Sequence, residues 1–82
     1  MKYPAFSIRD AKASSFGFPY FDINDKCAQR GFAFQINNND IYSFSPQDYD
    51  LYQVGYFDME KGCFESLGVP EFVVAGTAVF GK

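Results

Sequence analysis

The chain has 82 residues, of which 48% are hydrophobic, and carries a formal net charge of −3 at pH 7. This length supports one hydrophobic core and excludes a second, so we expect a single domain over residues 1–82. No apolar run reaches the roughly eighteen residues of a membrane span, and the first residues lack the apolar stretch of a signal peptide. We therefore expect no membrane partner and a protein that stays in the cytoplasm where it is made.

Residues 2–9 have the alternation of a β-strand. Phe6 and Ile8 fall on one face of this strand, whereas Ser7 and Arg9 fall on the other. Pro4 cannot donate to a sheet ladder, which places it at an edge or at the start of the strand.

Residues 10–20 are rich in small residues and contain Gly17 and Pro19, which predicts a loop. Two interpretations of this loop remain open. It buries its aromatic rings in the core, or it presents them to a partner. The rings belong to Phe16, Phe18 and Tyr20.

Residues 22–37 are predicted to form the main helix. Asn24 is a suitable N-cap, because its side-chain oxygen can accept a hydrogen bond from an amide of the first turn. Gly31 costs about 1 kcal/mol relative to Ala inside a helix, a cost that close packing of the helix on a sheet would justify. Residues 37–40 end the helix, because asparagine and aspartate side chains compete for the backbone. The expected buried stripe comprises Cys27, Ala28, Gly31, Phe32 and Ile36.

Two strands separated by a single helical turn are predicted next. Residues 41–44 form the first, short strand. Ser45 then has the position of an N-cap, with Pro46 at the first helical position and Asp48 placed to complete a capping box. Residues 51–57 form the second strand, and because both of its faces carry apolar groups we expect it to be central in the sheet.

The C-terminal part is predicted to begin with a hairpin. Residues 58–62 form its turn, with Gly62 at the position where a positive φ is easiest. Residues 63–67 return as a strand that residues 68–70 interrupt, and residues 71–80 are ambiguous between helix and strand. Together the elements predict an α+β fold, a small antiparallel sheet of three to five strands with one helix packed on a face.

The rings of this chain are more numerous than its core requires. Eleven Phe and six Tyr make up 21% of the sequence, and one small core does not hide so many. Some rings must be exposed or must lie in a subunit contact. Because a small sheet also leaves edges that favour pairing, we expect a homo-oligomer, most simply a dimer.

No pattern of catalytic or cofactor-binding residues is present. The chain has no His, the commonest general base, and its two cysteines do not make a zinc site. The glycine-rich motifs that bind nucleotides are absent too. The acidic residues between positions 48 and 60 are explained as cap and turn residues. We therefore expect a non-catalytic protein without cofactor or metal, in which Cys27 and Cys63 are buried free thiols.

Charge is divided along the chain: residues 1–30 have a net charge of +2 and residues 31–82 have −5. Aromatic and basic side chains together are typical of single-stranded nucleic-acid binding, in which rings stack on bases and cations contact phosphates. An alternative is a protein–protein module whose acidic C-terminal half binds a basic partner. The residues predicted to bind nucleic acid are Arg9, Lys12, Phe16, Phe18, Tyr20, Lys26 and Arg30.

Three sequence blocks occur in a recognisable order. They are SIRDAKASSFGFPYF at residues 7–21, NDKCAQRGF at residues 24–32 and PQDYDLYQVGYFDMEKG at residues 46–62. Their order and spacing resemble the small nonstructural protein of gokushovirus-type microviruses, which are icosahedral phages with circular single-stranded DNA. The resemblance extends over residues 6–72.

This resemblance implies a phage protein that is made in the cytoplasm of the infected bacterium and is not built into the capsid. The family is described as DNA-binding or linked to replication, with a role in single-stranded DNA synthesis or in the switch to packaging. The resemblance brings no catalytic residues. The implied partner is single-stranded DNA or a replication complex; in the alternative, the acidic half binds a basic viral or host replication or packaging protein.

Overall fold

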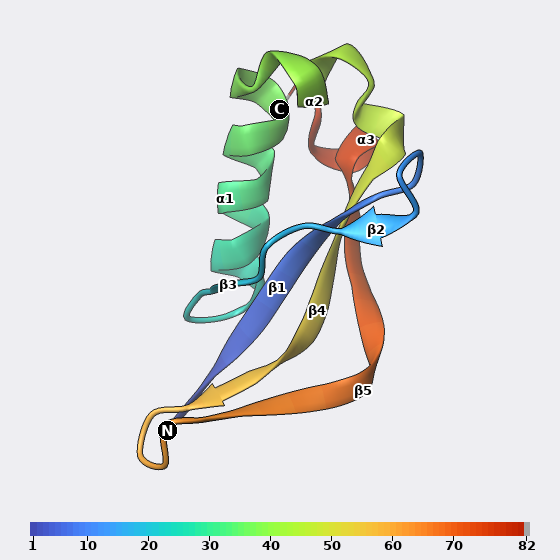
Figure 1. The fold of residues 1–82 in the computed structure, drawn as a ribbon. Coiled ribbons are helices and arrows are strands. Elements are labelled where there is room, and N and C mark those ends of the chain that lie inside the picture. The colour runs from blue at the N-terminus through green and yellow to red at the C-terminus, as the bar shows by residue number, and fades with distance from the viewer. Residues whose placement is uncertain (82) are drawn as a thin grey trace.

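The structure, a computed structural model, describes residues 1–81. A curled antiparallel sheet runs the length of the molecule, and three α-helices gather at one end of it, which confirms the predicted α+β fold (Figure 1). The elements in chain order are β1 (Lys2–Asp10), β2 (Ser15–Phe16), β3 (Tyr20–Phe21), α1 (Asp25–Asn38), α2 (Asp40–Phe44), the 3-10 turn η1 (Pro46–Asp48), β4 (Tyr49–Asp58), β5 (Cys63–Ala75) and α3 (Gly76–Val79).

The sheet has the order β2-β1-β4-β5, and the two-residue strand β3 also pairs with β1. β4 lies between β1 and β5 and pairs with β1 over almost its whole length, from Asp10↔Tyr49 to Lys2↔Asp58. This confirms the prediction of a central strand in residues 51–57. The loop predicted over residues 10–20 is docked on β1 by β2 and β3, so it is more ordered than its composition indicates.

The core lies between α1 and one half of the sheet. The helix begins as predicted: the Asn24 side chain accepts a hydrogen bond of 2.8 Å from the Cys27 amide. Its apolar stripe meets side chains of β1 and β4, because both surfaces must leave water together. Cys27 and Gly31 are only partly buried, so the stripe is narrower than predicted. The buried apolar cluster comprises Phe6, Ala28, Phe32, Ile36, Tyr49 and Leu51.

Gly31 does not mark a close approach of helix and sheet, so that prediction is wrong. A Cβ at this position would meet nothing within 4 Å. The close approach occurs at Gly76 instead, where α3 packs on η1. A Cβ there would overlap the carbonyl oxygen of Pro46 and would lie 2.5 Å from that of Tyr49.

Residues 41–44 lie in the helix α2, so the predicted strand is wrong. The physical reason is a local cap: the Asn39 side chain accepts from the Ile41 amide at 2.9 Å, and the Asn39 carbonyl accepts from Ser43. The predicted capping box also fails, because the Ser45 side chain makes no cap hydrogen bond. η1 is held by its backbone and by the proline at its start.

β5 continues through the predicted break and ends only at Ala75. Its pairing with β4 changes register, from Gly55↔Ser66 to Gln53↔Glu71, so that residues 67–70 bulge out opposite a single residue of β4. The ambiguous segment 71–80 is therefore strand first and then the short helix α3. All of this segment lies within the described residues 1–81.

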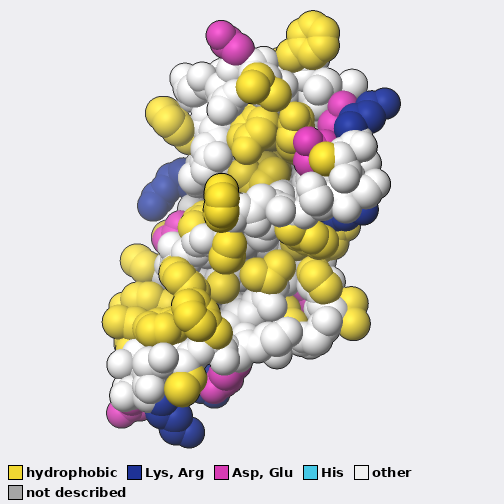
Figure 2. All heavy atoms as spheres, in the orientation of Figure 1, with side chains coloured by type: hydrophobic (Ala, Val, Ile, Leu, Met, Phe, Trp, Pro, Cys, Tyr) yellow, Lys and Arg dark blue, Asp and Glu magenta, His cyan; other side chains and the backbone are white. Residues whose placement is uncertain are grey.

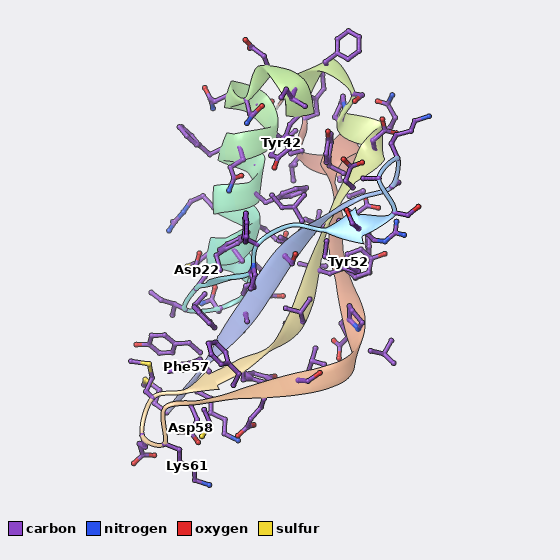
Figure 3. All side chains as sticks on the ribbon, in the orientation of Figure 1. Asp22, Tyr42, Tyr52, Phe57, Asp58 and Lys61 are labelled. Atoms are coloured by element: carbon purple, nitrogen blue, oxygen red, sulfur yellow. The ribbon has the colours of Figure 1, made fainter. Side chains whose placement is uncertain are left out.

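The β4–β5 hairpin turn follows the prediction. Gly62 has φ +67°, a conformation that glycine adopts without steric cost. Figure 3 shows Asp58 and Lys61 at this turn. The Asp58 carboxylate accepts hydrogen bonds from the Lys61 amide at 3.1 Å and the Glu60 amide at 2.9 Å. These two bonds, that from Lys61 foremost, hold the pKa of Asp58 below its ordinary value, because they stabilise the charged form.

Both cysteines are free thiols, as predicted. Their predicted burial is wrong for Cys63, which is exposed on β5, whereas Cys27 is partly buried on α1. None of the helices within residues 1–81 has the length and apolar character needed to cross a membrane.

Candidate nucleic-acid interface

The aromatic loop after β1 is fastened by hydrogen bonds that the sequence places close together. The hydroxyl of Ser7, itself almost fully buried, donates to the Gly17 carbonyl at 2.7 Å. The Gly17 amide in turn donates to the Ile8 carbonyl at 2.8 Å. The carboxylate of Asp10 accepts from the Lys12 amide at 3.0 Å and so shapes the turn between β1 and β2. Phe16 is thereby held at a fixed place on the sheet.

Three rings form a row across the sheet, on the face opposite the helix-packed residues of β1. Phe16 of β2 contacts Tyr52 of β4 with ring centroids 5.4 Å apart, and Tyr52 contacts Phe72 of β5 at 5.8 Å. Both pairs are nearly perpendicular, at 78° and 85°. Figure 3 shows Tyr52 on the side of the sheet away from α1. We call these three residues the aromatic row.

Strand register explains why these rings share a face. Successive side chains of a strand point to opposite faces. Because Phe6 points into the core, Ser7 and Arg9 point away from it. Directly opposite partners in a sheet lie on the same face, and the pairs are Ser7↔Tyr52 and Tyr52↔Phe72 across β4, with Arg9↔Phe16 on the other side.

The aromatic row is open to ligands at its two ends. Phe16 is 41% exposed and Phe72 is 58% exposed, whereas Tyr52 between them is partly covered by both. Exposed rings held in edge-to-face contact keep a fixed orientation, because each neighbour restricts the next. An unpaired base can stack on such rings without first paying for their ordering.

One end of the aromatic row carries positive charge. The guanidinium carbon of Arg9 lies 5.9 Å from the centroid of the Phe16 ring, and Lys12 is exposed in the adjoining turn. Within residues 1–81 Arg9 forms no ion pair, so its donors are available to a phosphate. Asp50 lies opposite Arg9 in the pairing of β1 with β4 and reduces the local positive potential.

The other predicted residues lie at different places. Phe18 is almost fully exposed in the short loop between β2 and β3. Lys26 and Arg30 are exposed on α1, which covers the opposite face of the sheet. The structure thus brings Arg9, Lys12 and Phe16 together, and separates them from the two cations of the helix.

Tyr20 belongs to the core contacts. Its ring centroid lies 6.1 Å from that of Phe6, and its hydroxyl donates to the Ala28 carbonyl at 3.4 Å. Burial, assisted by the negative charge of Asp22, raises the pKa of Tyr20 to about 12. Of the two interpretations of the loop, burial thus applies to Tyr20. Phe18 and Phe16 are exposed, and their presentation to a partner stays a prediction.

Sequence reasoning missed Tyr52 and Phe72. Tyr52 was placed correctly on a strand, but nothing local distinguishes an outward ring from an inward one on a strand that is apolar on both faces. Phe72 lies in a segment of ambiguous structure. Its pairing with Tyr52 depends on the four-residue bulge in β5, which no short-range pattern predicts.

Several acids of the C-terminal half have partners within the chain. Glu60 lies 3.3 Å from the N-terminal ammonium group, and Glu65 lies 2.9 Å from the Lys2 ammonium group. Asp58 accepts hydrogen bonds from the amides of its own turn. Residues 1–81 contain no group of three or more side chains placed to bind a metal ion.

Comparison with curated proteins and with solved structures gives no match for this chain. A family match, in contrast, extends over residues 3–79, and so includes every strand and helix from β1 to α3 except the first residue of β1. The family is described as Phage ORF5 protein. The chain therefore belongs to this family of phage proteins.

Proposed function

We propose that this phage protein binds single-stranded DNA, without catalysis, through the aromatic row and the two cations beside it. The observation that supports this most is the arrangement of three rings from three strands on a helix-free sheet face, ending at Arg9. Proteins that bind single strands without sequence preference use rings as stacking surfaces and nearby cations for the backbone.

The charge of the chain favours single strands over duplex. Duplex binding depends on many cations that displace counterions from the phosphates, and the net charge here is −3. Stacking requires only that the bases are unpaired. With Arg9 and Lys12 as the two phosphate contacts, the logarithm of the binding constant should fall with the logarithm of salt concentration with a slope of about −1.4.

The biological setting follows from the resemblance to the nonstructural protein of gokushovirus-type members of the Microviridae. In this proposal the protein acts in the cytoplasm of the infected bacterium, where viral single strands are synthesised. It holds single-stranded DNA during that synthesis or during the switch from replication to packaging.

Fluorescence anisotropy of a labelled oligothymidine tests the proposal. Phe16→Ala and Phe72→Ala each remove one stacking ring and should weaken binding roughly 5- to 150-fold, the equivalent of 1–3 kcal/mol. Phe34→Ala removes an exposed ring from α1 and is the matched control, which should bind like the wild type. Circular dichroism confirms that each variant is folded.

Two results would contradict the proposal. Absence of binding by the wild type at low salt would remove single-stranded DNA as the ligand and would direct attention to protein partners. An equal loss in Phe34→Ala would show that binding does not depend on the aromatic row.

A further inference from the structure

The half of the sheet that lies beyond the helices has one apolar face without a covering layer. Figure 1 shows β1, β4 and β5 extending from the helical end as a bare ribbon. Tyr3, Phe57 and Phe64 are directly opposite partners across these three strands and so share a face. Phe21 of β3 joins them, with its ring centroid 5.6 Å from Phe57 and 5.8 Å from Phe64.

The opposite face of the same ribbon carries the charges. Lys2 and Glu65 form an ion pair of 2.9 Å there, and Asp58 pairs with Lys2 across the strands. The ribbon is therefore amphipathic: its charged side chains share one face with Tyr56, and the rings of Tyr3, Phe21, Phe57 and Phe64 lie on the other. Figure 2 shows hydrophobic side chains gathered over this end of the molecule.

The apolar face exposes an area comparable to one side of a small protein–protein interface. Met1 and Met59 continue the pairing of β1 with β4 two positions beyond Tyr3 and Phe57, and the Met59 amide donates to the Met1 carbonyl at 3.0 Å. Met1, Phe21, Met59 and Phe64 are 73%, 42%, 54% and 72% exposed. At about 200 Å² for a fully exposed side chain of this size, these four present roughly 500 Å² of apolar surface. We call this surface, with Tyr3 and Phe57, the ribbon patch.

We infer that the ribbon patch is the contact surface of a homodimer, in which two ribbons pack face to face. An apolar sheet face is stable only when a second layer covers it, and the described chain supplies none at this end. Two copies of the ribbon patch together bury roughly 1,000 Å², which reaches the lower bound for a specific protein–protein contact.

A second copy matches the ribbon patch in chemistry as well as in area. The patch has no charged side chain of its own, and the N-terminal ammonium group of Met1 is paired with Glu60, so the partner must also be apolar and uncharged there. An isologous contact brings the patch against itself and meets this requirement without any further residue. Phenylalanine, tyrosine and methionine are also the side chains enriched in protein interfaces.

The surface of the whole chain is consistent with a missing partner. It exposes 5367 Å², whereas a folded monomer of 9.3 kDa is expected to expose about 5,000 Å². A shallow pocket of about 170 Å³ adjoins the ribbon patch and offers a place for a side chain of the second copy. Its lining includes Pro19, Phe21, Gly55 and Phe64.

Sedimentation equilibrium without DNA tests this inference, which does not depend on the proposed function. The wild type is expected at twice the mass of the 9.3 kDa chain. Phe64→Glu places a charge in the ribbon patch and should give monomers; because this side chain is already exposed, the variant should fold. Phe44→Glu adds the same charge at an exposed ring of α2 and should remain dimeric.

Three outcomes would overturn the inference. A wild type that is monomeric at every concentration excludes the dimer, and if that monomer sediments with phosphatidylcholine vesicles the patch is a lipid contact. If Phe44→Glu dissociates the dimer and Phe64→Glu leaves it intact, the contact surface of the dimer lies on the helices. Met59→Glu, in the hairpin turn, is a second variant that places a charge in the ribbon patch. A dimer that persists in both Phe64→Glu and Met59→Glu would likewise exclude the ribbon patch as the contact surface.

Discussion

Gly76 is the position at which the smallest change to the chain should have the largest effect on stability. It begins α3 and lies buried where the C-terminal segment packs on η1. A methyl group there would overlap the Pro46 carbonyl oxygen, would lie 2.5 Å from the Tyr49 carbonyl oxygen, and would lie 3.3 Å from the Ile36 side chain. Two of these three obstacles are backbone atoms, which cannot rotate away.

The expected cost of Gly76→Ala follows from this crowding. Overpacking a close-packed site costs about 1–3 kcal/mol, and rigid backbone obstacles place this site near 3 kcal/mol. In a domain of this size each kcal/mol lowers Tm by about 4–8 °C, so the variant should unfold roughly 12–24 °C below the wild type. Thermal unfolding followed by circular dichroism measures the difference.

Gly31→Ala is the matched control, with an expected effect of opposite sign. A Cβ at Gly31 meets nothing within 4 Å, and alanine favours a helix interior by up to about 1 kcal/mol. Gly31→Ala should therefore raise Tm by a few degrees. A Gly76→Ala variant as stable as the wild type, or a Gly31→Ala variant equally destabilised, would show that the close approach at Gly76 does not limit stability.

Three further predictions concern single hydrogen-bonded side chains. The pKa of Asp58 lies below its ordinary 3.8, so its charge contributes stability above pH 3.8, and this stability is lost as the pH falls through the lowered pKa. The free energy of unfolding of Asp58→Asn should therefore fall less steeply with decreasing pH than that of the wild type. An identical pH dependence of the two proteins in acid would contradict this. The pKa of Tyr20 is raised from 10.0 to about 12, so the neutral hydroxyl contributes stability below pH 10, and this stability is lost as the pH rises toward 12. The free energy of unfolding of Tyr20→Phe should therefore fall less than that of the wild type between pH 10 and 12. An equal fall in both proteins would exclude this role of Tyr20. Ser7→Ala leaves the Gly17 carbonyl without its side-chain donor and should cost about 1 kcal/mol in urea unfolding, with faster hydrogen exchange at Gly17; unchanged exchange would show that the loop is held by other contacts.

Features of the fold that depend on neighbouring residues could be predicted from the sequence. The alternation of Phe6 and Ile8, the cap at Asn24 and the hairpin glycine Gly62 each act within a few residues, and the structure has all three. The helix α2 (Asp40–Phe44) is also capped locally, but at five residues it is too short to show helical periodicity.

Features set by pairing between distant residues could not be predicted in this way. The bulge in β5 shifts its register against β4 and brings Phe72 opposite Tyr52, twenty positions earlier in the chain. In the candidate interface, Arg9 and Phe16 were therefore identified and the other two rings were not. Tyr20 has a similar spacing to its neighbours on the loop, yet β3 turns it toward Phe6 because paired residues in a sheet share a face.

The most direct test of the central claim is an NMR titration of the isotope-labelled protein with an unlabelled oligothymidine. We expect the largest chemical-shift changes at Phe16, Tyr52 and Phe72, smaller changes at Arg9, and no changes in α1. Stacked bases shift nearby ring and amide resonances strongly, so a contact with the aromatic row should be visible residue by residue. Changes confined to α1, or an unchanged spectrum at low salt, would contradict the claim that this face of the sheet binds single-stranded DNA.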